Sequence, residues 1–399
     1  MCSPNTNGNK LTGNFGDSTL SYPIPTGFTA GPTVWNYEGV GIGDSIALGT
    51  GGGGNTVWTR LETLQGLATG DILNKGVNGE KSGDVDVRFQ TDALDVLAKT
   101  VYLIAGTNDG VNSVTIPTVI ANYLSMYNKL TAMSPTPAFV IGEVTPGTRT
   151  GGSNTTIEQF QEWVKKLNAA IRKFCVDNIV KLAPAYQEMA ETNVANEDDM
   201  LPAYATDTVH PNTTGYDRLG DLFNVAAVPS RMYRWGYSAL AVNDESWDWW
   251  ILNGTSSISG DPDVGTLVLP QNQNADSDVK CLEEFSKTIT ISPAVAAGTV
   301  TIKYRTSTGN FDRNDGVIGW NTYTAPFATS NQFIQIRLEG SSAADANVST
   351  ISMTWTAGVP IIALTGSLSG VSALSGSMAL NLKLSGSLAS VSTATGGIG

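Results

Sequence analysis

Between residues 36 and 230, short apolar runs alternate with longer segments in which apolar side chains recur at helical spacing. The runs predict buried β-strands and the longer segments predict amphipathic helices. Thr155, followed three residues later by Glu158, is typical of a capping box that opens a helix. The expected strands are the run that begins at Val40 and the runs 100–105, 138–141 and 179–182, and the expected helices are 55–67, 119–130 and the one opening at Thr155.

This alternation of strands and helices predicts an α/β fold, in which a parallel sheet is covered by helices on both faces. In such sheets, reacting groups gather at the carboxyl ends of the strands. Candidate chemistry is therefore expected directly after the apolar runs.

The pattern changes after about residue 230, where helical periodicity disappears and Gly-, Ser- and Thr-rich turns separate alternating runs such as 298–304 and 332–338. Such runs are typical of an antiparallel β-sandwich. The aromatic residues of this region, in 247–250 and at Trp320 and Tyr323, allow two interpretations. They fill the core of the sandwich, which we favour, or they form a platform that binds sugar.

Both ends of the chain differ from these two regions. Residues 1–35 are rich in Asn, Gly, Thr and Pro and predict an extended arm. In the tail, Leu-Ser-Gly-Ser-like segments recur at a spacing of ten, so the same side chains would keep to one strand face, and Lys383 is the only charge there. Either this β-repeat pairs with copies from other chains, giving a homo-oligomer for which a trimer is one option, or it is a disordered Gly/Ser tail.

We therefore expect four parts: an arm (1–35), an α/β domain (36–230), a β-sandwich (231–360) and a repeat tail (361–399). The length of 399 residues fits more than one domain.

Composition narrows the classes of partner. The chain carries 23 basic and 36 acidic residues, a net charge of −13, which argues against binding nucleic acid. Three distant cysteines predict no disulfide framework, and no Cys/His cluster predicts a metal, so no cofactor is expected. The N-terminus lacks the features of a signal peptide, and no segment approaches membrane-spanning length. The protein is thus expected to stay in the cytoplasm or to leave by lysis.

The candidate chemistry begins at Gly43-Asp44-Ser45, which follows the apolar run from Val40. A serine needs a base to take its proton, and the chain contains one histidine, His210, with Asp207 three residues upstream. A second Gly-Asp-Ser ends at Ser18, but no buried strand precedes it. Four glycines, 51–54, lack the Gly-Lys-Ser/Thr of a phosphate-binding loop and are interpreted as a flexible loop beside the site.

Two further segments could supply hydrogen-bond donors. Gly79 closes Asn-Lys-Gly-Val-Asn-Gly, and Asn108 lies in Gly-Thr-Asn-Asp directly after the run 100–105. A glycine N–H at a turn and an asparagine amide at a strand end suit a carbonyl oxygen that becomes negative during acyl transfer.

In order, these four segments resemble the four conserved blocks of the SGNH/GDSL hydrolase family, which has a flavodoxin-like three-layer α/β/α fold and hydrolyses esters. The resemblance implies Ser45 as nucleophile, His210 as general base and Asp207 as the acid that orients it. It implies an oxyanion hole made of the N–H groups of Ser45 and Gly79 and the Asn108 side chain. It covers roughly residues 36–230, and no cofactor or metal is implied.

The β-rich region and the repeat loosely resemble parts of phage tail proteins. The leading hypothesis is a serine esterase that removes O-acetyl groups from a polysaccharide, carried on a virion and acting on host surface glycan. Two alternatives stay open: a lipase or long-chain esterase, and a virion structural protein that binds glycan without catalysis.

Overall fold

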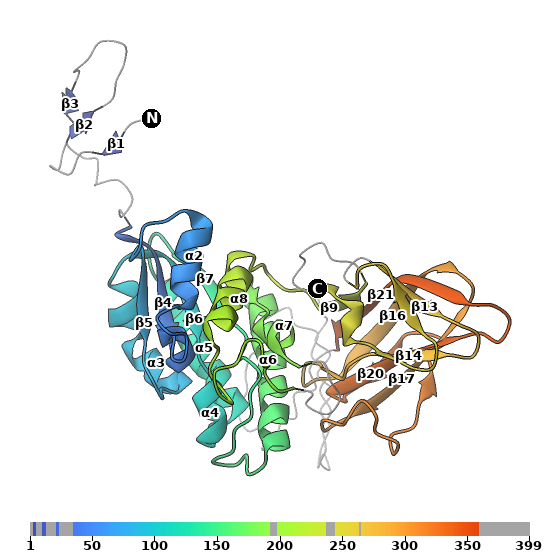
Figure 1. Ribbon diagram of the computed structural model, residues 1–399. Helices are drawn as coiled ribbons and strands as arrows, with labels where there is room; N and C mark the ends of the chain where they lie inside the picture. The colour runs from blue at the N-terminus through green and yellow to red at the C-terminus, as the bar shows by residue number, and fades with distance from the viewer. Residues whose placement is uncertain are drawn as a thin grey trace, which may run out of the picture.

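The computed structural model describes residues 35–191, 198–236, 246–262 and 265–358, and the backbone alone of 3–4, 10–12, 21–23 and 244–245. Figure 1 shows an α/β domain beside a β-rich domain. The first ends with helix α8 (Thr213–Asn224) and the second begins with strand β9 (Met232–Trp235). Before them, three short antiparallel strands lie in the N-terminal arm: β1 (Ser3–Pro4), β2 (Lys10–Thr12) and β3 (Ser21–Pro23). The second Gly-Asp-Ser at Ser18 and the repeat tail 361–399 lie outside the described residues.

The α/β domain is built on a five-stranded sheet in which every neighbouring pair is parallel. Its order is β5-β4-β6-β7-β8, so the first strand of the sheet in sequence, β4, is second from the edge. This is the flavodoxin-like order, and its switch point lies between β4 and β6. The predicted parallel α/β fold is confirmed. The strands are β4 (Tyr37–Gly43), β5 (Ile72–Gly76), β6 (Ala98–Ile104), β7 (Ala138–Gly142) and β8 (Lys181–Ala183).

Helices cover both faces of this sheet. In β6, Val101 and Leu103 face one core cluster while Tyr102 and Ile104 face another, as the two-residue period of a strand requires. The first cluster is completed by α3 (Ser82–Phe89), the π-helix η1 (Gln90–Leu94), α5 (Ile116–Thr131) and α6 (Ile157–Asn178). The second is completed by α1 (Ser45–Leu48), α2 (Val57–Gln65), α7 (Ala185–Met189) and α8.

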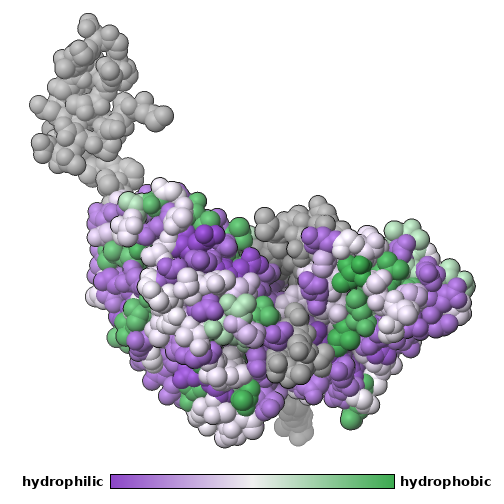
Figure 2. Space-filling model, in the orientation of Figure 1, coloured by the Kyte–Doolittle hydropathy of each residue, from purple (hydrophilic) through white to green (hydrophobic). Residues whose placement is uncertain are grey.

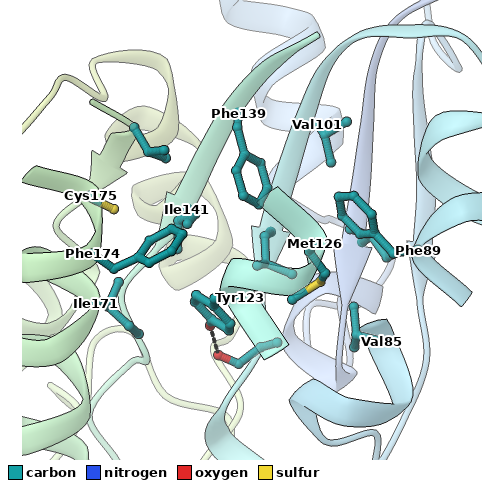
Figure 3. Packing of buried hydrophobic residues seen from close by; sticks show 14 of the residues in the cluster. Val85, Phe89, Val101, Tyr123, Met126, Phe139, Ile141, Ile171, Phe174 and Cys175 are labelled. Carbon is teal, nitrogen blue, oxygen red and sulfur yellow. Dashed lines mark hydrogen bonds between the residues drawn. The ribbon is translucent and has the colours of Figure 1, made fainter. Parts of the chain in front are cut away.

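Figure 3 shows the first cluster, where aromatic rings from strands and helices meet. Phe89 of α3 packs edge-on against Phe139 of β7, and Phe174 of α6 packs edge-on against Tyr123 of α5. The buried Tyr123 hydroxyl donates to the carbonyl oxygen of Ala105 at 2.7 Å, so its polar end is satisfied just beyond β6. This bond ties α5 to the carboxyl edge of the sheet.

Several predicted boundaries differ from the observed ones by one to three residues, as in α5, which begins at Ile116 and not at 119. The capping box uses Thr156 and Gln159, because helix α6 begins at Ile157 and Gln159 Oε1 accepts from the backbone N–H groups of both Thr155 and Thr156. Strand β8 begins at Lys181 because Ile179, with φ 56°, ends α6 in the left-handed conformation.

The β-rich domain consists of two sheets that share one core, and the alternating runs at 298–304 and 332–338 form its neighbouring antiparallel strands β17 and β20. One edge pair, β9 with β10, is parallel, which departs from the expected antiparallel pattern. The seven-stranded sheet contains β9, β10 (Asp244–Glu245), β12 (Ser257–Ser259), β13 (Thr266–Leu269), β16 (Lys287–Ala297), β19 (Phe327–Thr329) and β21 (Ala346–Ala357). The six-stranded sheet contains β11 (Ile251–Leu252), β14 (Asn274–Asp276), β15 (Lys280–Cys281), β17 (Val300–Ser307), β18 (Asn321–Thr322) and β20 (Phe333–Gly340).

The aromatic residues of this domain mostly fill its core. Trp247 and Trp250 are buried there around the 3-10 helix η3 (Trp247–Trp249). Tyr323 packs against it, and its hydroxyl accepts from the Ile291 N–H at 3.0 Å. The core interpretation is therefore confirmed for these residues, whereas Trp320 lies outside that core.

Helix α6 connects the two domains through polar contacts. The guanidinium of Arg172 stacks 4.6 Å from the centre of the Tyr233 ring, and Lys165 Nζ donates to Asn310 Oδ1 at 3.4 Å. Figure 2 shows a surface on which hydrophilic and hydrophobic residues are mixed, consistent with a mean hydropathy of −0.04. Within the described ranges, none of the helices has the length and apolar character to span a bilayer.

The turn after β4 depends on two residues. Gly43 has φ 149°, and a Cβ there would lie 1.7 Å from the Ile104 carbonyl oxygen, so no other residue fits. Asp44 caps helix α1, because its Oδ1 accepts from the Ile46 N–H at 2.9 Å. Asp44 is fully buried, and this burial raises its pKa to about 6, despite hydrogen bonds from Ile46 and Thr107.

Gly41→Ala should destabilise the α/β domain, because a Cβ at Gly41 would lie 2.0 Å from the buried Trp58 ring. We expect a loss of about 1–3 kcal/mol or more in the free energy of unfolding, measured by chemical denaturation. Gly83→Ala is the matched control. It lies inside α3, where its Cβ would meet only Asn122 Nδ2 at 3.5 Å, so alanine should raise stability by up to about 1 kcal/mol. Equal effects of the two substitutions would contradict the packing of α2 on β4.

Asp44→Asn should change how stability depends on pH. Because the pKa of Asp44 is about 6 in the folded chain and its ordinary value is 3.8, the folded state holds the extra proton between these values. Its contribution to stability therefore falls as pH rises through that window, by about 1.4 kcal/mol per pH unit. Asparagine keeps the cap without the charge, so the variant should gain about 3 kcal/mol over the parent by pH 7 and nothing near pH 3.5. A difference in unfolding free energy that does not vary with pH would contradict the buried charge.

Candidate active site

Ser45 is the first residue of helix α1 and stands at the carboxyl edge of the sheet. As the first helical residue, its backbone N–H has no acceptor within the helix. The Asp44 N–H donates to the Ile104 carbonyl oxygen at 3.1 Å, so the start of α1 is fastened to the end of the neighbouring strand β6. Ser45 is only 8% exposed.

The structure brings His210 and Asp207 to this serine. His210 Nε2 lies 3.0 Å from Ser45 Oγ, and its Nδ1 lies 2.8 Å from Asp207 Oδ2. The other carboxylate oxygen, Oδ1, accepts from the N–H groups of Val209 and His210 at 2.8 and 2.7 Å. The three side chains predicted from the sequence thus form one chain of hydrogen bonds.

The charge of Asp207 sets the tautomer of His210. Partial burial works against ionisation, but the hydrogen bonds from the His210 ring and from two backbone N–H groups lower the pKa of Asp207 below its ordinary value. An ionised carboxylate only accepts, so Nδ1 carries the proton in the neutral ring and Nε2 is left to accept from the Ser45 hydroxyl.

Asn108 lies beside these hydrogen-bonded side chains, in the short helix α4 (Thr107–Val111) that follows β6. Its Nδ2 donates to the Glu80 carbonyl oxygen at 2.9 Å. Gly79 directly precedes Glu80 in the loop after β5 and has φ 79°. The bond from Asn108 to Glu80 therefore brings Gly79 and Asn108 to the same part of the carboxyl edge. The second N–H of Nδ2 has no protein acceptor among the described residues.

Arg149 is a site residue that the sequence did not reveal. It lies in the loop after β7, and its Nη1 donates to Asn108 Oδ1 at 3.0 Å. Because a guanidinium can only donate, this contact fixes which end of the Asn108 amide carries the oxygen. The adjacent Thr148 N–H donates to the Thr208 carbonyl oxygen at 2.8 Å, which ties the same loop to the His210 segment. In the sequence, the only feature that could have pointed to Arg149 is its position after a predicted strand of the sheet.

Arg88 of α3 also escaped prediction. Its Nη2 donates to the Gly43 carbonyl oxygen at 3.0 Å and its Nη1 to that of Lys75 at 2.8 Å, so it joins the ends of β4 and β5. It also pairs with the Glu80 carboxylate at 2.6 Å. Arg88 therefore holds in place the loop on which Gly79 and Glu80 lie.

The four glycines 51–54 lie beside the site, as expected from the sequence. A Cβ at Gly51 would lie 3.0 Å from the Pro211 carbonyl oxygen and 3.2 Å from the Cβ of His210. The Thr206 hydroxyl donates to the Gly51 carbonyl oxygen at 2.9 Å. This loop thus forms one wall around the imidazole.

Asp109, next to Asn108, anchors α4 to α3. It is buried, which raises its pKa, and it accepts from the Ser82 N–H at 2.8 Å and from the Ser82 hydroxyl at 2.7 Å. In the part of the chain that the structure describes, no three His, Cys, Asp or Glu side chains are grouped as metal ligands.

This arrangement has the parts that acyl transfer needs. A hydroxyl is bonded to an imidazole, and the imidazole to a carboxylate. The amide of Asn108 is held beside them by bonds at both of its ends, so it could serve as a fixed donor.

Comparison with known proteins agrees with this fold. Residues 42–218 match the model of the GDSL-like Lipase/Acylhydrolase family. A short stretch of 39 residues is 49% identical to the uncharacterized lipoprotein YqeF of Bacillus subtilis (strain 168), but it spans only 10% of this chain and 16% of that protein.

Three solved structures are similar to about half of the chain. A GDSL-like lipase from Bacteroides thetaiotaomicron VPI-5482 has 23% identity, with 46% of this chain and 84% of that chain covered and a TM-score of 0.38. A member of the lipolytic protein G-D-S-L family from Veillonella parvula DSM 2008 has 18% identity, 47% and 95% coverage and a TM-score of 0.38. An acetyl xylan esterase has 21% identity, 46% and 96% coverage and a TM-score of 0.37.

The family match begins inside β4 and ends inside α8, so it spans the parallel sheet and every predicted site residue. It does not reach the β-rich region. Residues 42–218 are therefore a GDSL-like α/β domain.

Proposed function

We propose that the protein is a serine-dependent carboxylic ester hydrolase. The observation that carries this proposal is the hydrogen-bonded series from Ser45 Oγ to His210 Nε2 and from His210 Nδ1 to Asp207 Oδ2, at 3.0 and 2.8 Å. A serine hydroxyl is a weak nucleophile until a base takes its proton, and Nε2 is placed to do so.

In the first half of the reaction, Ser45 Oγ attacks the ester carbonyl carbon while its proton moves to His210 Nε2. Asp207 stabilises the resulting imidazolium. The carbonyl oxygen becomes negative and accepts hydrogen bonds from the Ser45 and Gly79 N–H groups and from Asn108 Nδ2. The imidazolium then gives its proton to the departing alkoxide, so the alcohol leaves and an acyl group remains on Ser45.

In the second half, His210 takes a proton from water as that water attacks the acyl carbon. The same three donors hold the oxyanion again. The bond to Ser45 Oγ breaks, the imidazolium returns the proton to Ser45, and the carboxylic acid is released. All proton transfers therefore pass through the one histidine.

The substrate that we propose is an O-acetylated polysaccharide. Polar side chains lie near the site: the Thr50 N–H donates to the Ser45 carbonyl oxygen at 3.0 Å and the Thr50 hydroxyl to Asn78 Oδ1 at 2.7 Å. Arg149 donates to Asn108 Oδ1 at 3.0 Å. A long acyl chain would need an apolar wall, whereas an acetyl group on a hydroxyl-rich carrier does not. Transport on a virion is a proposal that rests on the tail, outside the described residues.

Ser45→Ala should abolish hydrolysis. Without the hydroxyl no acyl intermediate forms, and we expect the rate of 4-nitrophenyl acetate hydrolysis and of acetate release from acetylated polysaccharides to fall by at least about 10³-fold. Ser18→Ala removes the serine of the other Gly-Asp-Ser and is the matched control, which should keep the parent rate. Equal rates in the parent and in Ser45→Ala would exclude this mechanism.

The same assays separate the alternatives. A lipase or long-chain esterase would hydrolyse 4-nitrophenyl palmitate faster than the acetate or butyrate ester. A glycan-binding protein without catalysis would release no acetate in any assay.

Arg149→Met should lower kcat by about 10–100-fold with little change in KM, because the Asn108 amide would lose the contact that orients it towards the oxyanion. Arg149→Lys, which keeps a charged donor, should recover part of the rate. The decisive measurement repeats Arg149→Met in an Asn108→Ala background. There it should cost much less, since the group that Arg149 positions is gone. The same loss in both backgrounds would show that Arg149 does not act through Asn108.

A further inference from the structure

The β-rich domain has a polar hollow of about 390 Å³ on the outer face of its six-stranded sheet. Side chains alternate along β20, so Ile336 and Leu338 face the core while Gln335 and Arg337 point outwards. The loop from Gly309 to Trp320 covers part of this outer face. The hollow lies between the uncovered part of the sheet and the end of that loop.

A buried arginine holds the loop in place. Arg305 of β17 is 1% exposed, and its guanidinium donates to Gln335 Oε1 at 2.8 Å, to the Arg313 carbonyl oxygen at 2.7 Å and to the Asp315 carbonyl oxygen. Burying a guanidinium is costly unless its donors are satisfied, and here backbone oxygens of the loop satisfy them. The wall of the hollow is therefore a fixed part of the fold.

One indole side chain is held at the hollow by two cations. The guanidinium carbons of Arg337 and Arg305 lie 4.3 and 4.7 Å from the centre of the Trp320 ring. Arg337 is in turn fixed by Asp276, with two bonds of 2.6 and 2.7 Å. Trp320 is only half-buried, so part of its ring surface remains available at the hollow.

Several polar groups in the hollow have no hydrogen-bond partner among the described residues. Asn253 Nδ2 donates to Asn274 Oδ1 at 2.7 Å, which leaves Asn253 Oδ1 and Asn274 Nδ2 unused by the described residues. The exposed side chain of Asn314 likewise makes no hydrogen bond to the described residues. The Nη1 group of Arg337 has no acceptor among them, because its bonds to Asp276 use Nε and Nη2. Donors and acceptors thus stand together beside an aromatic ring.

We propose that this hollow binds a sugar unit of the polysaccharide whose ester groups are cleaved at Ser45. Vicinal hydroxyls both donate and accept, so they match paired amides and a guanidinium, and the apolar face of a sugar ring matches an indole. Arginines outnumber carboxylates by three to two in the lining, so a uronic acid is accepted as well as a neutral sugar. This inference rests on the proposed function, which supplies the polymer.

Helix α6 contacts both the loop that borders the hollow and the helix that carries Asn108. Asn310, at the start of the loop, accepts from Lys165 of α6. Two and five residues earlier in α6, Trp163 and Phe160 pack against Gly110 of α4, the helix that carries Asn108. A polymer held at the hollow therefore stays close to the catalytic domain.

The test uses the full chain in a Ser45→Ala background, so that the polymer is bound without being cleaved. Affinity electrophoresis is run in gels containing acetylated xylan, acetylated glucomannan or acetylated pectin. We expect at least one polymer to retard the protein, and Trp320→Ala and Asn314→Ala to weaken that binding at least about tenfold. Val317→Ala, on the same loop but 92% exposed and outside the hollow, is the matched control and should bind like the parent.

Three results would overturn the inference: no retardation by any of the three polymers, equal retardation of the Asn314→Ala variant, or binding to pectin alone that high salt removes. Asn314 is exposed and makes no hydrogen bond to the described residues, so its variant decides the matter even if Trp320→Ala proves unstable. With Ser45 present, the hollow variants should keep the parent rate on 4-nitrophenyl acetate. Loss of polymer binding with that rate intact separates this inference from the proposed function, which fails only if the parent does not hydrolyse esters.

Discussion

The candidate site depends on how closely the chain passes the end of β6 as it leaves β4. Only the missing side chain of Gly43 lets the backbone come near enough for the Asp44 N–H to reach the Ile104 carbonyl oxygen. Helix α1 therefore starts at the switch point of the sheet, and Ser45 faces the loops that follow the neighbouring strands. Arg88 donates to the Gly43 carbonyl oxygen and pairs with the Glu80 carboxylate. The position of Gly43 therefore affects both the start of α1 and the loop that carries Gly79 and Glu80.

The parallel sheet could be predicted because its strands are buried on both faces and read as continuous apolar runs. Ser45, His210 and Asp207 could be found because Ser45 follows such a run and the chain has a single histidine, with Asp207 three residues before it. Strand β5 and helix α3 gave a weaker signal. Only Ile72 of the five residues of β5 is buried, and α3 has just three buried residues in eight, so neither shows a clear period.

Arg149 and Arg88 could not be predicted, because their role depends on the path of the chain between distant residues. The contact from Arg149 to Asn108 spans 41 positions, and that from Arg88 to Gly43 spans 45. The same is true of Trp320, whose neighbours Arg305 and Arg337 come from two different strands. Trp320 is a tryptophan like the buried Trp247, so the residue type alone does not tell a core position from one at the hollow. Only the fold of the loop distinguishes the two positions.

His210 is the single imidazole of the chain, and both of its ring nitrogens lie within hydrogen-bonding distance of a partner in the site. Any nitrogen resonance, isotope effect or chemical modification that belongs to histidine therefore reports on this one ring. The protonation of the site can in principle be followed directly in the intact chain, without selective labelling and without removing other histidines first.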